Sequence, residues 1–464
     1  MSDHSSDHST VEPHVPPALR TALNRVRTDD GARWAFRLSM AMALVLYVVV
    51  GRRQWFIRDD WAFLLTRTVI RDTRGVDDWL FTAQDGHWMT PPILVYRLIQ
   101  NLFGLESYWP YLVPVMALHV GAVLLVRILC RRVGVSAWTT TLLCSVLLVF
   151  GGGWENIVFG IQITYNMSLV AFLAQVVLVD HEGRADRRDV GGAVLGVIGV
   201  MSSGFGPFFI LGVFVLLAFR RRWTAAAIAV APQALAYAWW FVFWSSDNAA
   251  AVTPGPRSQV PAFAVRGITA TFESLMGIAS LAGVAILATV AIAVWAGASW
   301  RVQSLLLTMW VVVVAMFLGV GVQRIGFGVD SAAASRYQHF AAMMLVPALG
   351  LAIDHVARWS MPVHRAVRLV VFASVVLNAG WLQVRGAEWG DRARGEQGTF
   401  ELIVGSPLAG TVDPQIRPEQ FSPDVSVAWL PFLVEAGAIT ARAPATADEL
   451  ARVRVALQLP PDPG

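Results

Sequence analysis

The chain has 464 residues, of which 56% are hydrophobic and only 15% are charged, and its formal net charge is +4. This composition excludes an ordinary soluble domain and a disordered chain, because soluble domains carry about 25% charged residues. All 36 basic residues are arginine and lie mostly between apolar runs, so the charge indicates membrane topology and no nucleic-acid partner.

Residues 1–33 are polar and predict a disordered cytoplasmic tail. Beyond them, apolar runs recur with lengths near the roughly 20 residues that a membrane-spanning helix needs. We therefore predict an all-α polytopic membrane protein with about eleven transmembrane helices, at residues 34–50, 108–130, 137–153, 164–180, 190–203, 206–219, 223–244, 276–298, 302–322, 337–357 and 364–384. The fifth and sixth runs are short, and only SSGFG separates them.

The arginines are distributed unevenly over the predicted loops. With the N-terminus in the cytoplasm, the short inner loops contain thirteen arginines and the short outer loops contain four. Because cytoplasmic loops carry the excess of positive charge, we expect a cytoplasmic N-terminus. With an odd number of spans, the C-terminus is then extracytoplasmic.

The first predicted outer loop, residues 51–107, is too long to be a simple connector. It opens with WFIRDDWAFLL, which contains Arg58, Asp59 and Asp60, and continues through DDWLFTAQDGHWMTPP, which contains His87. WAFLLTRTVI has helical spacing and PPILVYRLIQNLF begins with proline, which suits the first turn of a helix. Both segments predict short helices that lie along the membrane interface, and loops of this length are usually functional.

Other polar loops fall on the same predicted outer side. GGGWENIVFGIQ at 151–162 follows the third run, and QRIGFGVDSAAASRYQH at 323–339 precedes the tenth. Residues 385–464 contain frequent prolines and charges, and predict a small extracytoplasmic C-terminal domain or tail. The polar residues therefore gather at one face of the membrane.

Such residues suit the transfer of a group from a lipid phosphate. A carboxylate can take the proton of an attacking hydroxyl, and burial near the low-dielectric boundary tends to raise its pKa toward that of a useful base. Arginines or a divalent cation can neutralise a departing phosphate.

Several segments follow one another along the chain: a first span followed by RDDW, then DGHWMTPPILVYRL, then FGLESYWPYLVP and a span with His119. The order of these segments resembles the GT-C superfamily of polytopic glycosyltransferases, in particular its uncharacterised bacterial members. The resemblance covers roughly residues 34–384 and is concentrated in 55–120; GGGWENIVFGIQ and ASRYQHF are also similar to such proteins. It implies a multi-pass enzyme of the bacterial plasma membrane that moves a sugar from a polyprenyl-phosphate donor to an envelope glycan, lipid or protein acceptor. Inversion at the sugar carbon without a covalent enzyme intermediate is implied as well.

Carried over by position, the resemblance implies that Asp59 is the general base and Asp60 its partner or a metal ligand. Several characterised members have Asp-Glu where this chain has Asp-Asp, so the division of roles stays open. His87 is implied as a further catalytic or substrate-binding group, and a divalent cation, Mg²⁺ or Mn²⁺, is a candidate ligand of all three. The candidate substrate- and phosphate-binding residues are Arg58, Glu155, Asn156, Gln162, Arg324, Arg336, Tyr337 and His339.

Simpler interpretations stand beside these. Asp59 and Asp60 can merely pair with Arg58 or Arg52, and His119 can be a neutral histidine bonded to a neighbouring helix. A transporter or flippase for a lipid-linked glycan is the main alternative function, but its sites should lie near the bilayer midplane and between internal repeats, and no clear repeat is present. A polysaccharide polymerase or ligase is a third possibility, but it would have its large loop late in the chain.

Overall fold

The computed structural model describes residues 29–245, 255–276, 292 and 294–460, and in this part of the chain every regular element is a helix. Seven helical stretches are long and apolar enough to cross a membrane. They are α2 (Asp29–Gly51), α7 (Trp109–Arg132), η3 with α10 (Gly160–Val179), α13 (Trp223–Trp244), α16 with η6 (Trp300–Phe327), α17 (Ser335–Val356) and α18 (Met361–Val404). The prediction of an all-α polytopic membrane protein is confirmed.

Three shorter helices also belong to the bundle: α8 (Ala137–Leu148), α11 (Arg187–Val200) and α12 (Gly206–Phe219). Each coincides with a predicted run, so ten of the eleven predicted runs are helical in the described residues. The remaining run, 276–298, lies largely outside the described residues.

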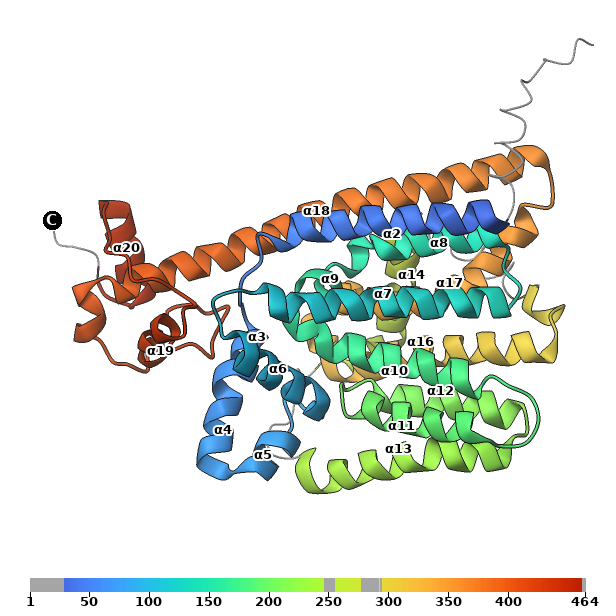
Figure 1. The fold of residues 1–464 in the computed structure, drawn as a ribbon, viewed down its shortest axis with the longest axis horizontal. Helices are drawn as coiled ribbons and strands as arrows, with labels where there is room; N and C mark the ends of the chain where they lie inside the picture. The colour runs from blue at the N-terminus through green and yellow to red at the C-terminus, as the bar shows by residue number, and fades with distance from the viewer. Residues whose placement is uncertain (1–28, 246–254, 277–291, 293, 461–464) are drawn as a thin grey trace, which may run out of the picture.

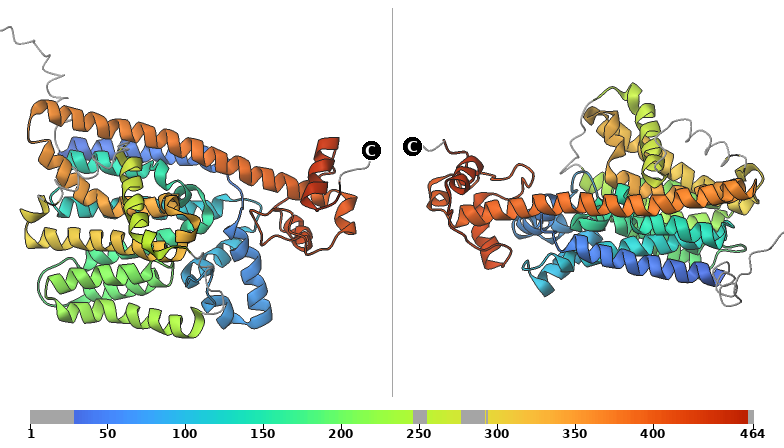
Figure 2. Two further views of the ribbon diagram at one scale, coloured as in Figure 1. Left: turned by 180° about the vertical axis from the view of Figure 1, so that it is seen from behind. Right: turned by 90° about the horizontal axis from the view of Figure 1, so that it is seen from above.

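The bundle is layered from one edge to the other. α2, α8 and α18 lie together at one edge and α13 lies at the opposite edge, with α7, α10 and α17 between them (Figure 1). Helix α14 (Val260–Met276), which the hydropathy pattern does not predict as a span, packs across α16 and α17 (Figure 2). α17 is the most buried of the long helices.

Local sequence explains where the first helices begin and meet. Asp29 and Asp30 stand in the first turn of α2, where negative charge is favourable, and Pro110 stands in the first turn of α7. A Cβ at Gly51 would lie 2.5 Å from the Trp109 ring, so the glycine allows α2 and α7 to approach closely.

The segment 51–107 folds into short helices at one end of the bundle, which we call the loop end. They are α3 (Asp59–Trp61), the π-helix η1 (Ala62–Thr66), α4 (Arg67–Arg74), α5 (Val76–Phe81) and α6 (Thr90–Phe103), so both predicted loop helices are present. Buried Arg67 donates to the carbonyl oxygens of Trp79 at 3.1 Å and Thr82 at 2.7 Å. Trp240 of α13 donates to the Phe81 carbonyl at 2.8 Å, which fixes this segment to the bundle.

Helix α18 continues well past the other helices at the loop end and carries the C-terminal residues with it (Figure 1). Its 44 residues form one helix, so the predicted division at 384/385 falls inside it. The C-terminal part, with α19 (Leu430–Glu435) and α20 (Ala447–Ala456), contacts this extension, and the Arg442 N–H donates to the Glu401 carbonyl oxygen at 3.0 Å. It therefore lies at the same end of the molecule as α3–α6 (Figure 1).

Candidate active site

A cavity of about 260 Å³ opens at the loop end, and we call it the loop-end cavity. Residues from widely separated parts of the chain line it, and they divide into two chemical groups. The polar group is Arg58, Asp59, Gln84, Asp85, His87, Gln162, Thr164, Tyr165, Gln323, Arg324, Arg336 and Tyr337. The apolar group is Phe63, Met89, Ile161, Phe205, Phe208 and Val320, with Gly204 and Gly319 between them. The cavity can therefore hold a charged group next to an apolar one.

Arg58 and Asp59 form one wall of the cavity. Arg58 has a left-handed backbone with φ 53°, which is unfavourable for a residue with a side chain, and its N–H donates to Ser422 Oγ at 2.8 Å. Its guanidinium also lies over the Phe421 ring, with Cζ 4.5 Å from the centroid. The C-terminal part thus holds the backbone just before Asp59 in place.

Asp59 is exposed to the cavity at the start of α3. The surrounding protein displaces water and raises the pKa of its carboxyl, an effect that Asp85 and Asp424 strengthen. Arg58 and Arg336 oppose the shift. A raised pKa makes the ionised carboxylate a better proton acceptor.

Asp60 faces away from the cavity and is fully buried. Its Oδ1 accepts the Tyr96 hydroxyl at 2.7 Å, and its Oδ2 accepts the Tyr108 hydroxyl at 2.7 Å and the Ile57 N–H at 3.3 Å. Burial raises the pKa of Asp60 to about 7, against the effect of these hydrogen bonds. Tyr108 Oη also accepts the Gly160 N–H at 2.7 Å, so this network ties α3 to the start of the α10 segment.

His87 enters the cavity from a tight turn. The backbones of Gln84 and His87 exchange two hydrogen bonds of 2.9 Å, and Asp85 and Gly86 between them have φ values of 50° and 77°. Such values favour the Asp-Gly pair that the sequence supplies. Burial lowers the pKa of His87 to about 4, with Asp85 opposing and nearby arginines assisting, so the imidazole is neutral at physiological pH.

Gly204 makes room for His87, and a methyl group there tests this contact. A Cβ at position 204 would lie 2.1 Å from His87 Nδ1, so Gly204→Ala should displace the ring or the turn. Overpacking of this kind costs about 1–3 kcal/mol. We expect a lower Tm for Gly204→Ala and recovery in Gly204→Ala/His87→Ala, because the second change removes the clashing ring.

A matched control is Gly121→Ala, where the added Cβ would meet only Val170 at 3.9 Å. Its Tm should not fall below that of the wild type, because alanine favours a helix more than glycine does. Equal Tm values for all the variants in differential scanning fluorimetry would contradict the tight packing of Gly204 against His87.

Two arginines share the cavity with Asp59. Arg324 ends α16 and Arg336 begins α17, and both line the cavity. In the part of the chain that the structure describes, neither forms an ion pair, whereas nearby Arg266 pairs with Glu273 at 3.0 Å. Their charges are therefore available to an anionic ligand.

The other predicted residues are divided between cavity and interior. Gln162 and Tyr337 line the cavity, and Gln162 Oε1 has no hydrogen-bond partner among the described residues. Glu155 is half-buried and does not line it, and Asn156 is buried, where its carbonyl oxygen accepts Asn166 Nδ2 at 2.7 Å.

His339 is fully buried outside the cavity. Its Nε2 lies 2.9 Å from His119 Nδ1, so the pair links α17 to α7. His119 is thus bonded to a neighbouring helix, as the simpler interpretation of that residue expects.

Several cavity residues were not predicted. Gln84 and Asp85 stand beside His87 in the DGHW turn, and their polarity was a usable signal, as it was for Gln323 next to Arg324. Phe421 and Ser422, which hold Arg58 without lining the cavity, could not be found in this way, because 364 residues separate Ser422 from Arg58.

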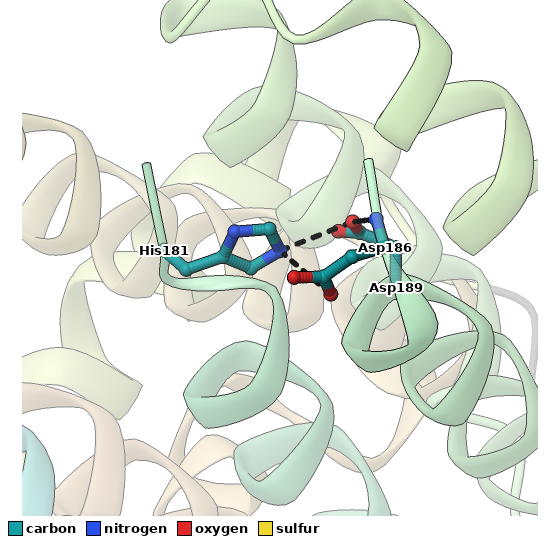
Figure 3. Close-up of side chains that lie close together, drawn as sticks. All are labelled: His181, Asp186 and Asp189. Atoms are coloured by element: carbon teal, nitrogen blue, oxygen red, sulfur yellow. Dashed lines mark hydrogen bonds and ion pairs between the residues drawn. The ribbon is translucent and has the colours of Figure 1, made fainter. Parts of the chain in front are cut away.

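The predicted metal ligands Asp59, Asp60 and His87 do not converge on one point, because Asp60 is directed at the two tyrosines. Among the described residues, the metal-like set of three close ligand groups is His181, Asp186 and Asp189 (Figure 3). That set follows α10, at the opposite end of this helix from the loop-end cavity.

A structural role accounts for this second set. Asp186 and Asp189 form a capping box at the start of α11. The Arg222 guanidinium lies 3.1 Å from Asp189 Oδ2 and 2.9 Å from His181 Nε2, and so supplies the positive charge that the carboxylates need.

Comparison with known proteins gives a fold but no family. No protein-family model and no curated protein matches the sequence. The crystal structure of ArnT from Cupriavidus metallidurans in the apo state is similar, with a TM-score of 0.53 and 14% sequence identity, over 92% of this chain and 88% of that chain. Since such low identity establishes only architecture, the conclusion is that this chain has a GT-C-like membrane fold.

Proposed function

We propose that the protein is an integral-membrane glycosyltransferase that moves a sugar from a polyprenyl-phosphate donor to an acceptor of the bacterial cell envelope. The loop end is then extracytoplasmic, with the N-terminus in the cytoplasm and the C-terminus outside. One observation carries the proposal: a carboxylate with a raised pKa, Asp59, shares a cavity with Arg324 and Arg336, which have no ion-pair partner among the described residues.

The chemistry assigned to the cavity is a single inverting displacement. Asp59 takes the proton of the acceptor hydroxyl as its oxygen attacks the anomeric carbon, and the bond from that carbon to the phosphate oxygen breaks. The departing polyprenyl phosphate carries the developing negative charge. Arg324 and Arg336 would neutralise it, since arginine's planar fork suits phosphate oxygens.

The two halves of the cavity fit a lipid-linked sugar. Phe205, Phe208 and Val320 provide apolar surface where the prenyl chain would leave the phosphate. A Cβ at Gly319 would lie 2.4 Å from the Phe208 ring, so the glycine lets Phe208 lie close against α16. Gln162 and neutral His87 can bond to sugar hydroxyls, and no step requires a divalent cation held by Asp59, Asp60 and His87.

A reconstituted assay separates this function from its main alternative. Purified full-length protein in proteoliposomes would receive synthetic polyprenyl-phosphate sugars, labelled in the sugar, with an envelope extract as the source of acceptor. A transferase produces a labelled glycoside and an equal amount of free polyprenyl phosphate. A transporter or flippase moves the intact labelled lipid without releasing polyprenyl phosphate, and that result would overturn the proposal.

Substitution of Arg336 tests its proposed contact with the donor phosphate. Arg336→Gln should lower kcat/KM for the donor by roughly 10- to 100-fold, because a hydrogen bond to a charged group contributes about 1.5–3 kcal/mol. Arg266→Gln is the matched control, since Arg266 is paired with Glu273 and Asp330 outside the cavity. Steady-state kinetics in which both variants lose the same activity would argue against a specific role for Arg336.

A further inference from the structure

A second, larger depression lies beside the loop-end cavity, on the extension of α18, and we call it the arginine groove. Its volume is about 800 Å³. It is lined by residues of α18, of the segment 417–421 and of α20 and its C-terminal flank, and its charged lining residues are Arg392, Glu396, Arg417, Glu419 and Arg452. None of these residues had a predicted role.

Three exposed arginines give the groove its charge. Arg392, Arg417 and Arg452 come from three different segments, and in the described part of the chain none of them forms an ion pair. The groove also contains two carboxylates. Glu396 is only 4% exposed and accepts the Ser422 hydroxyl at 2.6 Å, so it is directed into the protein and leaves Glu419 as the accessible acid. Positive charge therefore prevails at the groove surface.

The arginine groove adjoins the loop-end cavity through one aromatic ring. Phe421 lines the groove, and the Cζ atom of Arg392 lies 4.4 Å from its ring centroid. The Cζ atom of Arg58, which lines the loop-end cavity, lies 4.5 Å from the same centroid. A long ligand in the groove could thus reach Asp59, the next residue after Arg58.

The position of the groove favours a water-soluble ligand over a lipid headgroup. A Cβ at Gly151 would lie 3.0 Å from the Leu382 backbone nitrogen, so Leu382 is level with the loop end of α8. At about 1.5 Å per residue, Glu396 lies roughly 20 Å further along α18. Figure 1 shows this extension and α20 beyond the ends of the other long helices of the bundle.

We propose that the arginine groove binds an anionic glycan, one bearing carboxylates or phosphates, and presents its hydroxyl end to Asp59 as the acceptor. The acceptor role rests on the proposed glycosyl transfer, whereas the binding of an anionic glycan does not. Arginine forks recognise carboxylate and phosphate by paired hydrogen bonds.

The test measures binding by the full-length protein in phosphatidylcholine nanodiscs. Two fluorescent probes, a hexagalacturonate and a glycerol-phosphate hexamer, distinguish carboxylate from phosphate recognition, and neutral maltohexaose is the uncharged control. We expect at least one anionic probe to bind in a salt-sensitive manner. Arg417→Gln/Arg452→Gln should weaken that binding by about tenfold or more.

Arg385→Gln is the matched control, because Arg385 is an exposed arginine of α18 that pairs with Glu388 outside the groove. It should bind the probe as the wild type does. Three results would overturn the proposal. They are an equal loss of binding in Arg385→Gln, no binding of either anionic probe, and loss of probe binding by the wild type when phosphatidylglycerol is added to the nanodiscs.

The Asp59→Asn variant separates this inference from the proposed function. It should bind the anionic probe with wild-type affinity, since the groove does not include Asp59. Failure of the transferase proposal would appear in the transfer assay, and failure of the groove proposal would appear in the binding assay, each without the other.

Discussion

Asp59→Asn should lower the rate of sugar transfer by roughly 10²- to 10⁴-fold, which is the usual contribution of a general base. The amide has nearly the same shape as the carboxylate but cannot accept the acceptor's proton. Asp59 is exposed to the cavity and makes no hydrogen bond through its side chain to a described residue. Folding should therefore be intact, with an unchanged Tm and elution profile. The measurement is release of polyprenyl phosphate in proteoliposomes.

Asp72→Asn is the control for Asp59→Asn, because Asp72 is an exposed acid of the same loop whose partner is Arg71. Its activity should be that of the wild type. The pH profile gives a second criterion: transfer needs ionised Asp59, so kcat/KM should rise as pH passes upward through the raised pKa of Asp59. Near-wild-type transfer by Asp59→Asn would remove Asp59 from the role of base.

The fold was largely predictable because apolar runs near the bilayer thickness have few alternative structures. Two elements were not. Helix α14 carries Arg266 and Glu273 among its apolar residues, and these charges, which pair with each other, interrupt the hydropathy signal. The extension of α18 past residue 384 is held by contacts with the C-terminal part, such as the hydrogen bond from the Arg442 N–H to the Glu401 carbonyl oxygen, which hydropathy does not report.

The sequence predicted which segments form the candidate site better than it predicted which of their residues line the cavity. Successive residues of an α-helix point about 100° apart, so Asp59 can face the cavity while Asp60 faces Tyr96. Tyr337 lines the cavity, and His339, two residues further along α17, meets His119 instead. A polar motif shows that a segment gathers functional groups, but the rotation of its helix decides which of them reach the ligand.

Substitution of Asp60 should strongly lower the stability of the folded protein, just as substitution of Asp59 should strongly lower the rate of transfer. Asp60→Ala leaves two tyrosine hydroxyls and the Ile57 N–H without their acceptor, and each such buried group costs about 1–3 kcal/mol. We expect destabilisation of about 3 kcal/mol or more, and a smaller loss in Asp60→Asn, which keeps one acceptor oxygen. Unfolding in mixed detergent micelles measures this loss of stability. Asp77→Ala, at a solvent-exposed acid on α5, should have no effect.

The pH dependence of stability identifies the charge of Asp60. Its pKa is about 7 in the folded protein and near 3.8 when solvated, so the folded state holds this proton more tightly. The resulting stabilisation is complete below about pH 4 and is lost as pH rises through 7, by at most about 1.4 kcal/mol per pH unit. The stability of the wild type relative to Asp60→Asn should fall accordingly between pH 4 and 7.

A stability difference that does not change with pH would mean that Asp60 stays ionised throughout. Burial is the main cause that raises the pKa of Asp60, and the charge of neighbouring Asp59 adds to it. A proton retained by Asp60 near neutral pH removes one of the two charges and leaves the exposed carboxylate of Asp59 as the base. The sloping profile would thus assign Asp60 the positioning role and Asp59 the catalytic one.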